Sequence, residues 1–183
     1  GNWNDNAGIF NPGTGTVIFD GNTTIGGTST PSFGIILVNS GATVTLPVGS
    51  VSVSGNITVQ SGATFNANNG TITLTGATLQ TISANGATFN NLTVNKLGAS
   101  DVLLSSQLGL TGQLSIQASG IDVTSNGNLI LRSISDGPTG NGSIGPLPGT
   151  ANVVGDVVVQ RYHSAEGPVN RYISSPVTNA RVL

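Results

Sequence analysis

The chain has 183 residues and a formal net charge of −2, and only 7% of its residues are charged. This length fits one domain, or one and a fraction. The charge gives no electrostatic reason to expect nucleic acid or an anionic membrane as a partner. Cysteine is absent, which excludes disulfides, thiolate catalysis and cysteine-ligated metals.

Apolar residues form short strand-like runs. They make up 37% of the chain and recur in alternating or β-branched runs, which is typical of strands with one buried face. No helical period persists over about ten residues, because Gly or Pro interrupts almost every window. In chain order the predicted strands are TVIF (16–19), IILV (35–38), ATVTL (42–46), VSVSGNITV (51–59), GTITL (70–74), NLTV (91–94), DVLL (101–104), QLSI (113–116), GIDV (120–123), NLIL (128–131) and VVGDVVVQ (153–160).

Turn dipeptides separate these runs: Asp20-Gly21, Asn69-Gly70, Asn85-Gly86 and Asn126-Gly127. A hairpin-built sandwich or propeller would use such pairs as type I′ turns. A parallel solenoid would use them as left-handed corners between its faces. The dipeptides alone therefore leave both folds open.

An internal repeat favours the solenoid. Segments separated by 55–57 residues resemble one another: FNPGTGTVIFDG (10–21) and FNANNGTITLTG (65–76), FGIILVN (33–39) and FNNLTVN (89–95), GNITVQSG (55–62) and GQLSIQASG (112–120). The repeat unit is therefore roughly 56 residues long, which is enough for two or three coils. This repeat predicts an all-β, right-handed parallel β-helix (β-solenoid) over residues 1–150. In this interpretation equivalent residues of successive units stack, with Phe over Phe inside one core.

Residues 151–183 differ in composition and are predicted to cap the solenoid or to begin a following domain. PLPG (146–149) sets them apart, and VVGDVVVQRY (153–162) is expected to form one long strand. A polar loop and a second strand, RYISSPV (171–177), would complete a hairpin. The dipeptide Arg161-Tyr162 on the first strand would match Arg171-Tyr172 on the second, and these four are the candidate cap or interface residues. Tyr and Arg side chains can cover apolar surface while their polar ends remain in contact with water.

No motif in the sequence predicts a catalytic, metal or cofactor site. His163 and Glu166 are expected in a solvated loop, because no second His exists to complete a metal site. The other carboxylates, such as Asp20 and Asp101, are scattered, so no stacked acidic row of the kind used to cleave polysaccharides is expected.

Three further features have plainer interpretations. NWNDNAG (2–8) has oxygen ligands at alternate positions, as a Ca²⁺ loop does, but its single carboxylate, Asp5, favours a tight turn. Thr at alternate positions, as in TITLT (71–75), is compatible with ice or glycan binding. IILV (35–38) and NLIL (128–131) interrupt that pattern, and Thr is also a common residue of exposed strand faces. Trp3 is expected to pack into the first coil rather than to stack on a sugar.

Trp3 with FNPGTGTVIFDG (10–21), followed by TI, FxxLxVN and GxLxVxSG, resembles the β-helical repeat region of large secreted surface proteins of Bacteroidetes. The closing VVGDVVVQRY…RYISSPV is also similar to segments of that group. The resemblance implies an extracellular or cell-surface location, export by type IX secretion, and a non-enzymatic structural or adhesive role as a rigid stalk or fibre-forming module. Its expected partners are neighbouring domains or subunits, with glycans as further candidates. The alternative is a carbohydrate-binding or polysaccharide-cleaving β-helix.

Overall fold

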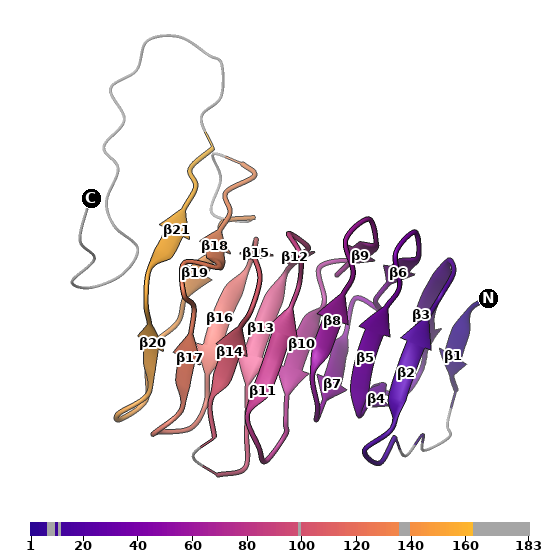
Figure 1. The fold of residues 1–183 in the computed structure, drawn as a ribbon, viewed down its shortest axis with the longest axis horizontal. Coiled ribbons are helices and arrows are strands. Elements are labelled where there is room, and N and C mark those ends of the chain that lie inside the picture. The colour runs from indigo at the N-terminus through magenta and orange to yellow at the C-terminus, as the bar shows by residue number, and fades with distance from the viewer. Residues whose placement is uncertain (7–9, 11, 99, 136–139, 163–183) are drawn as a thin grey trace, which may run out of the picture.

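The computed structural model describes residues 1–6, 10, 12–98, 100–135 and 140–162, and these form an all-β fold without a helix. Every pair of neighbouring strands is parallel, so the predicted parallel β-solenoid is confirmed (Figure 1). The chain visits three sheets in turn, and strands that follow one another along the chain belong to different sheets.

The three sheets are defined by their strands, given in stacking order. Sheet 1 holds β1 (Trp3–Asp5), β3 (Thr23–Gly27), β6 (Thr43–Thr45), β9 (Thr64–Asn66), β12 (Thr88–Phe89), β15 (Leu108–Leu110), β18 (Leu129–Leu131) and β21 (Val157–Val159). Sheet 2 holds β2 (Thr16–Phe19), β5 (Ile35–Val38), β8 (Ile57–Val59), β11 (Gln80–Ser83), β14 (Val102–Leu104), β17 (Asp122–Thr124) and β20 (Asn152–Val154). Sheet 3 holds β4 (Ser32–Phe33), β7 (Ser50–Val53), β10 (Thr71–Leu74), β13 (Asn91–Val94), β16 (Gln113–Ile116) and β19 (Ser143–Ile144).

One apolar core runs along the axis of the stack. Strands such as β10 and β13 alternate outward and buried side chains, because successive residues of a strand point to opposite faces. The buried set is one cluster that begins at Phe19 and ends at Ala151. Since each coil contributes inward residues from all three sheets, no coil can bury its apolar face without its neighbours.

Most coils contain 20–22 residues, as the paired residues Ser32↔Ser52, Thr43↔Thr64 and Gln80↔Val102 show, and the extremes before residue 113 are Thr16↔Ile35 (19) and Ile57↔Ile82 (25). Late in the chain the coil lengthens, and Gln113 pairs with Ser143. The added residues lie between β18 and β19, and those that the structure describes, 132–135 and 140–142, form the base of a protrusion. Backbone hydrogen bonds from Ile134 N–H to the Gly140 carbonyl (2.9 Å) and from Gly142 N–H to the Arg132 carbonyl (2.6 Å) hold its base.

The sequence repeat is real, but its predicted stacking is wrong. Phe33 lies on β4 of sheet 3, whereas its counterpart Phe89 lies on β12 of sheet 1. Both rings are fully buried, yet they belong to different faces of the solenoid. The same shift relates β2 to β10 and β5 to β13, eight strands further along in each case. Eight strands at three per coil are two and two-thirds coils, so each repeat is rotated to the next sheet.

The predicted strand over 153–162 is also corrected. It is two short strands, β20 and β21, which pair in parallel with β17 and β18. Gly155 turns the chain between them at a φ of 90°, a conformation that glycine adopts without steric cost. The stack therefore continues beyond the predicted boundary at residue 150, to Val159. The predicted second hairpin strand, 171–177, lies outside the described residues.

The predicted left-handed backbone conformation occurs at some of the four turn dipeptides. Asn85-Gly86 and Asn126-Gly127 both have positive φ at each residue. At 69–70 only Asn69 does, with a φ of 59°. Asp20-Gly21 is a corner without positive φ. The dipeptides therefore mark corners of the solenoid, but they do not share one backbone conformation.

Candidate functional site

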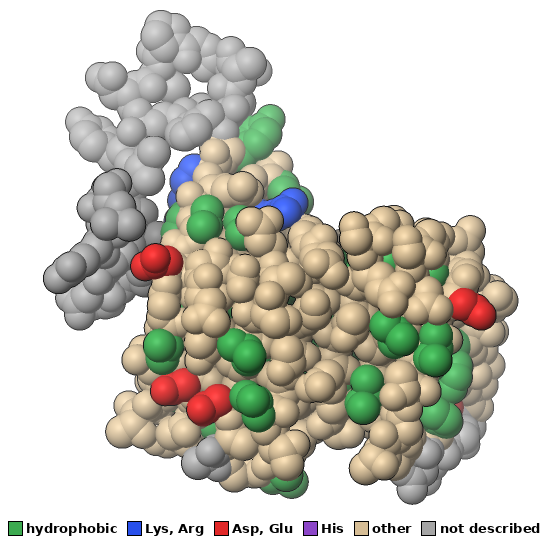
Figure 2. All heavy atoms as spheres, in the orientation of Figure 1, with side chains coloured by type: hydrophobic (Ala, Val, Ile, Leu, Met, Phe, Trp, Pro, Cys, Tyr) green, Lys and Arg blue, Asp and Glu red, His purple; other side chains and the backbone are tan. Residues whose placement is uncertain are grey.

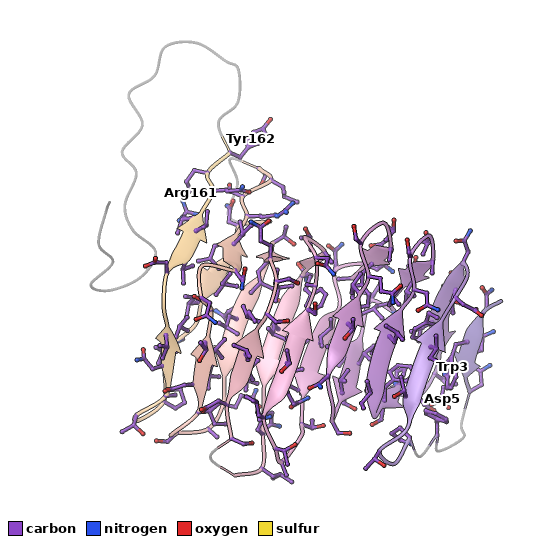
Figure 3. The ribbon with its side chains drawn as sticks, in the orientation of Figure 1. Trp3, Asp5, Arg161 and Tyr162 are labelled. Carbon is purple, nitrogen blue, oxygen red and sulfur yellow. The ribbon has the colours of Figure 1, made fainter. Side chains whose placement is uncertain are left out.

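Figure 3 shows that four of the residues singled out in the sequence lie at the two ends of the stack. Trp3 and Asp5 are on β1, at the N-terminal end, and Arg161 and Tyr162 follow β21, at the C-terminal end. Arg171 and Tyr172, like His163 and Glu166, lie outside the described residues. Since Tyr162 is exposed and its proposed partners are not described, the cap hypothesis stays a prediction.

Trp3 belongs to an aromatic cluster at the first coil. Its ring centroid lies 4.7 Å from that of Phe10 and 5.5 Å from that of Phe33, in edge-on geometries that aromatic pairs favour. Phe19 also meets Phe33 edge-on, at 6.2 Å. Trp3 therefore packs into the first coil, as expected.

Two carboxylates are closer together than the sequence indicated. Asp101 and Asp122 precede or begin strands of adjacent coils, and the Asp122 backbone N–H donates to Asp101 Oδ1 at 3.0 Å. Figure 2 shows few charged side chains on this face of the molecule. Among the described residues no three acidic, His or Cys side chains come together as a metal site. Asp101 and Asp122 are therefore neighbours in adjacent coils, which the sequence did not indicate.

A buried polar network lies at the corner between sheets 3 and 2. Lys96 and Gln80 are 3% and 1% exposed. Lys96 Nζ donates to the Thr78 carbonyl at 2.7 Å and to Gln80 Oε1 at 2.9 Å. Gln80 Nε2 donates to the Val53 and Gly55 carbonyls, at 3.1 and 2.7 Å. The network joins three successive coils, and each hydrogen-bonding atom of the Gln80 side chain has a partner.

Burial of the Lys96 ammonium lowers its pKa below the ordinary value, because removal from water penalises the charged form. The negative charge of Asp101 offsets part of this shift. The sequence did not single out Lys96 as a site. The only indication in the sequence was that Lys96 is an isolated basic residue in a stretch almost without charge.

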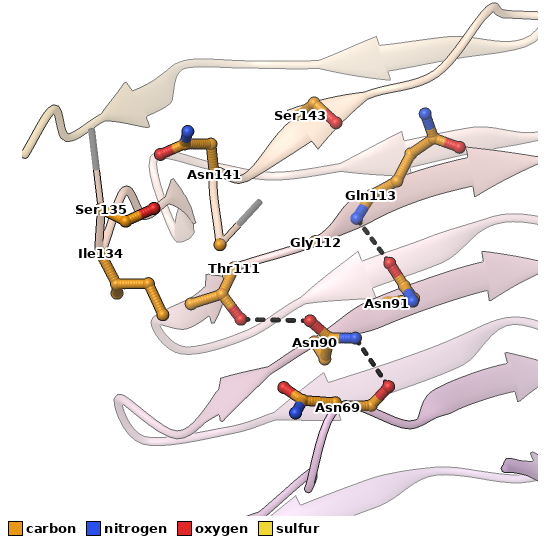
Figure 4. Close-up of a pocket in the computed structure, with 11 residues that line it drawn as sticks. Asn69, Asn90, Asn91, Thr111, Gly112, Gln113, Ile134, Ser135, Asn141 and Ser143 are labelled. Atoms are coloured by element: carbon orange, nitrogen blue, oxygen red, sulfur yellow. Dashed lines mark hydrogen bonds between the residues drawn. The ribbon is translucent and has the colours of Figure 1, made fainter. Parts of the chain in front are cut away.

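The described residues also form an open groove of about 640 Å³ beside sheet 3. Its floor consists of corner and strand residues from successive coils, and its wall is formed by residues 134–135 and 140–141, between β18 and β19 (Figure 4). Its lining includes Asn69, Asn90, Asn91, Gln113 and Ile134. The volume lies within the range of about 300–1,000 Å³ typical of small-molecule sites.

Asparagines organise the floor of the groove. Asn90 Nδ2 donates to the Asn69 backbone carbonyl at 2.8 Å, and the Gln113 backbone N–H donates to Asn91 Oδ1 at 2.8 Å. These bonds fix Asn90 and the carbonyl side of Asn91. Within the described residues, the side-chain amides of Asn69 and Gln113 and the Nδ2 of Asn91 have no hydrogen-bond partner. Polar groups therefore remain available in the groove.

Outside the groove, sheet 3 carries neutral polar side chains in straight files. One file consists of Ser32, Ser52, Thr73, Thr93 and Ser115, which pair in register from strand to strand. IILV (35–38) and NLIL (128–131), which interrupted the hydroxyl pattern in the sequence, lie on sheets 2 and 1. The hydroxyl file of sheet 3 is therefore continuous, contrary to the expectation from the sequence.

The fold and these features define the chain as a β-solenoid. Comparisons with protein families, curated proteins and solved structures gave no match. A search of the described residues for a helix long and apolar enough to cross a membrane also found none.

Proposed function

We propose that the chain is a non-enzymatic structural and adhesive module of an extracellular bacterial surface protein, where it acts as a rigid stalk or fibre-forming part. The observation that carries the proposal is the uninterrupted stack of parallel strands around one core from Phe19 to Ala151. Each coil is held by its neighbours through backbone hydrogen bonds and buried side chains, so the stack resists bending. The resemblance to secreted surface proteins of Bacteroidetes, exported by type IX secretion, supports the location.

The ends of the stack are the places where further domains or subunits would attach. Within the described residues, β20 and β21 each pair on one side only. An unpaired edge is a template for another strand. Neighbouring domains or subunits of the surface assembly are therefore the proposed partners, and Arg161 and Tyr162 lie where they would join.

Proteolysis of intact cells of the source organism tests the location. An antibody against residues 1–183 should label whole cells, and external protease should remove the signal. Detection only after the cells have been permeabilised would contradict the proposal. A cytoplasmic protein of known location serves as the control for cell integrity.

A second candidate function is polysaccharide cleavage, favoured by one observation, the proximity of Asp101 and Asp122 in adjacent coils. Pairs of carboxylates carry glycoside hydrolysis. Release of reducing sugar from a polysaccharide panel, and its loss in Asp101→Asn and Asp122→Asn, would establish this function. The structural proposal predicts no release from any polymer by the wild-type chain.

A further inference from the structure

The groove beside sheet 3 combines uncommitted amides with an exposed apolar side chain. Its floor offers the amides of Asn69, Asn91 and Gln113, and its wall offers Ile134, which is 62% exposed. A side-chain amide both donates and accepts hydrogen bonds. These amides are complementary to the hydroxyl groups of a ligand, because a hydroxyl group also donates and accepts hydrogen bonds.

None of the described residues that line the groove is charged. A charged ligand would therefore lose hydration without gaining an opposite charge, which is unfavourable. A neutral, hydroxyl-rich ligand has no such cost. The apolar side chain of Ile134 would contact the C–H face of a sugar ring, while the amides of the floor bind its hydroxyls.

The groove continues into a polar file on sheet 3. Ser50 pairs with Thr71, Thr71 with Asn91, and Gln113 with Ser143 in adjacent coils. Neighbouring strands are about 4.8 Å apart, a spacing close to the length of one ring in an extended sugar chain. An oligosaccharide lying along the file would thus meet a polar side chain at each ring and end in the groove.

We propose that this groove and the adjoining file bind a neutral oligosaccharide chain. The inference deepens the proposed adhesive function and depends on it, because it names the class of ligand that the surface module would hold. Neither Asp101 nor Asp122 is part of the site, so the proposal is one of binding without cleavage.

The test is calorimetric titration of the full chain with neutral oligosaccharides (gluco-, xylo-, manno- and chito-oligomers) and with acidic ones (oligogalacturonate). The groove variant is Asn69→Gly with Gln113→Ala. Glycine retains the left-handed conformation of Asn69, whose φ is 59°, and Gln113 is exposed, so the fold is preserved. The matched control is Asn126→Gly with Gln117→Ala, a left-handed asparagine at another corner and an exposed glutamine, neither of which lines the groove.

We expect at least one neutral series to bind the wild-type chain, with affinity that increases with chain length. The groove variant should bind about tenfold or more weakly, and the control within about twofold of wild type. Absence of binding by every neutral series, preference for the acidic series, or equal binding by the groove variant would each overturn the proposal. None of these results changes the outcome of the protease test on intact cells. A failure of the oligosaccharide proposal is therefore distinguishable from a failure of the proposed structural role.

Discussion

Asparagines at the corners have two roles at once. Asn85 adopts a left-handed φ of 47° and donates its Nδ2 to the Val59 carbonyl of the preceding coil at 2.6 Å. Asn68 has the same φ and donates to the Leu46 carbonyl at 3.2 Å. The residue thus tolerates the backbone of the corner and also satisfies a carbonyl that faces the next coil.

Substitutions at Asn85 separate the two roles. Asn85→Gly keeps the backbone conformation and loses the hydrogen bond, which should lower the free energy of unfolding by about 1 kcal/mol. Asn85→Ala also places a Cβ at positive φ and should cost about 1 kcal/mol more than the glycine variant. Urea unfolding of both variants measures the difference. A glycine variant less stable than the alanine variant would contradict this account of the corner.

The buried Lys96 should make stability depend on alkaline pH. Because its pKa is lowered in the folded chain, the unfolded chain binds more protons over the range between the folded and unfolded pKa values. Stability therefore rises with pH over that range, and it falls as pH drops through the folded pKa. Lys96→Met removes this titration and leaves the apolar part of the side chain.

We expect the free energy of unfolding of wild type, minus that of Lys96→Met, to increase between neutral pH and about pH 10. Urea unfolding at several pH values gives this difference, and the other titrating groups cancel in it. Parallel pH profiles for the two proteins would mean that burial does not perturb Lys96.

At the scale of elements, the sequence predicted best the strands with clear alternation. TVIF (16–19), IILV (35–38) and NLTV (91–94) coincide with β2, β5 and β13. The missed strands lack a clear apolar alternation, and they include β3 and β11 as well as the shorter β9, β12 and β15. Composition and repetition therefore give the fold class but not every strand.

The groove was not predictable, because it depends on the length of a coil. Asn69, Asn90 and Gln113 meet only when successive coils of about 21 residues are stacked, and the repeat of roughly 56 residues concealed that length. The wall of the groove, residues 134–135 and 140–141 after β18, carries no strand-like pattern. Lys96 was missed for a similar reason, since its partners Gln80 and Thr78 belong to the preceding coil.

A whole-coil deletion tests the coil length. Thr43 pairs with Thr64 one coil later, so deleting residues 43–63 joins Ala42 to Thr64 and removes β6, β7 and β8. NSGA (39–42) then replaces the equivalent QSGA (60–63) as the corner. We expect cooperative unfolding with lower stability, because each coil contributes separately and through its neighbours.

The control deletes residues 43–52, about half a coil, which places every following strand between two sheets. It should not unfold cooperatively when followed by circular dichroism in urea. If both deletions behave alike, the coil assignment is wrong.

At the scale of the molecule, the two ends of the stack differ. The aromatic rings of Trp3, Phe10 and Phe33 pack over the core at the first coil. At the other end Val153, Val157 and Val159 are only partly buried. Trp3 and Phe10 are also partly buried, so the ends differ in the kind of side chain that meets the core, and the cap hypothesis concerns the C-terminal one.

Truncation tests the cap hypothesis. A chain of residues 1–150 lacks β20 and β21, so it should expose the inward side chains of β17 and β18 and associate in sedimentation velocity. A chain of residues 1–162 retains those strands and lacks Arg171 and Tyr172; it should associate less than 1–150 but more than the full chain. If 1–150 is monomeric and as stable as 1–183, the capping role of 151–183 is wrong.

The most direct test of the central claim, a continuous structural stack without an internal moving part, is amide hydrogen exchange along the full chain. Moving lids and hinges come from regions of low local stability, whereas a uniform stack opens from its ends. The account predicts the slowest exchange in inner strands such as β8, β10 and β13, with rates that rise toward β1 and β21. Fast exchange within the inner coils, flanked by slower exchange on both sides, would contradict it.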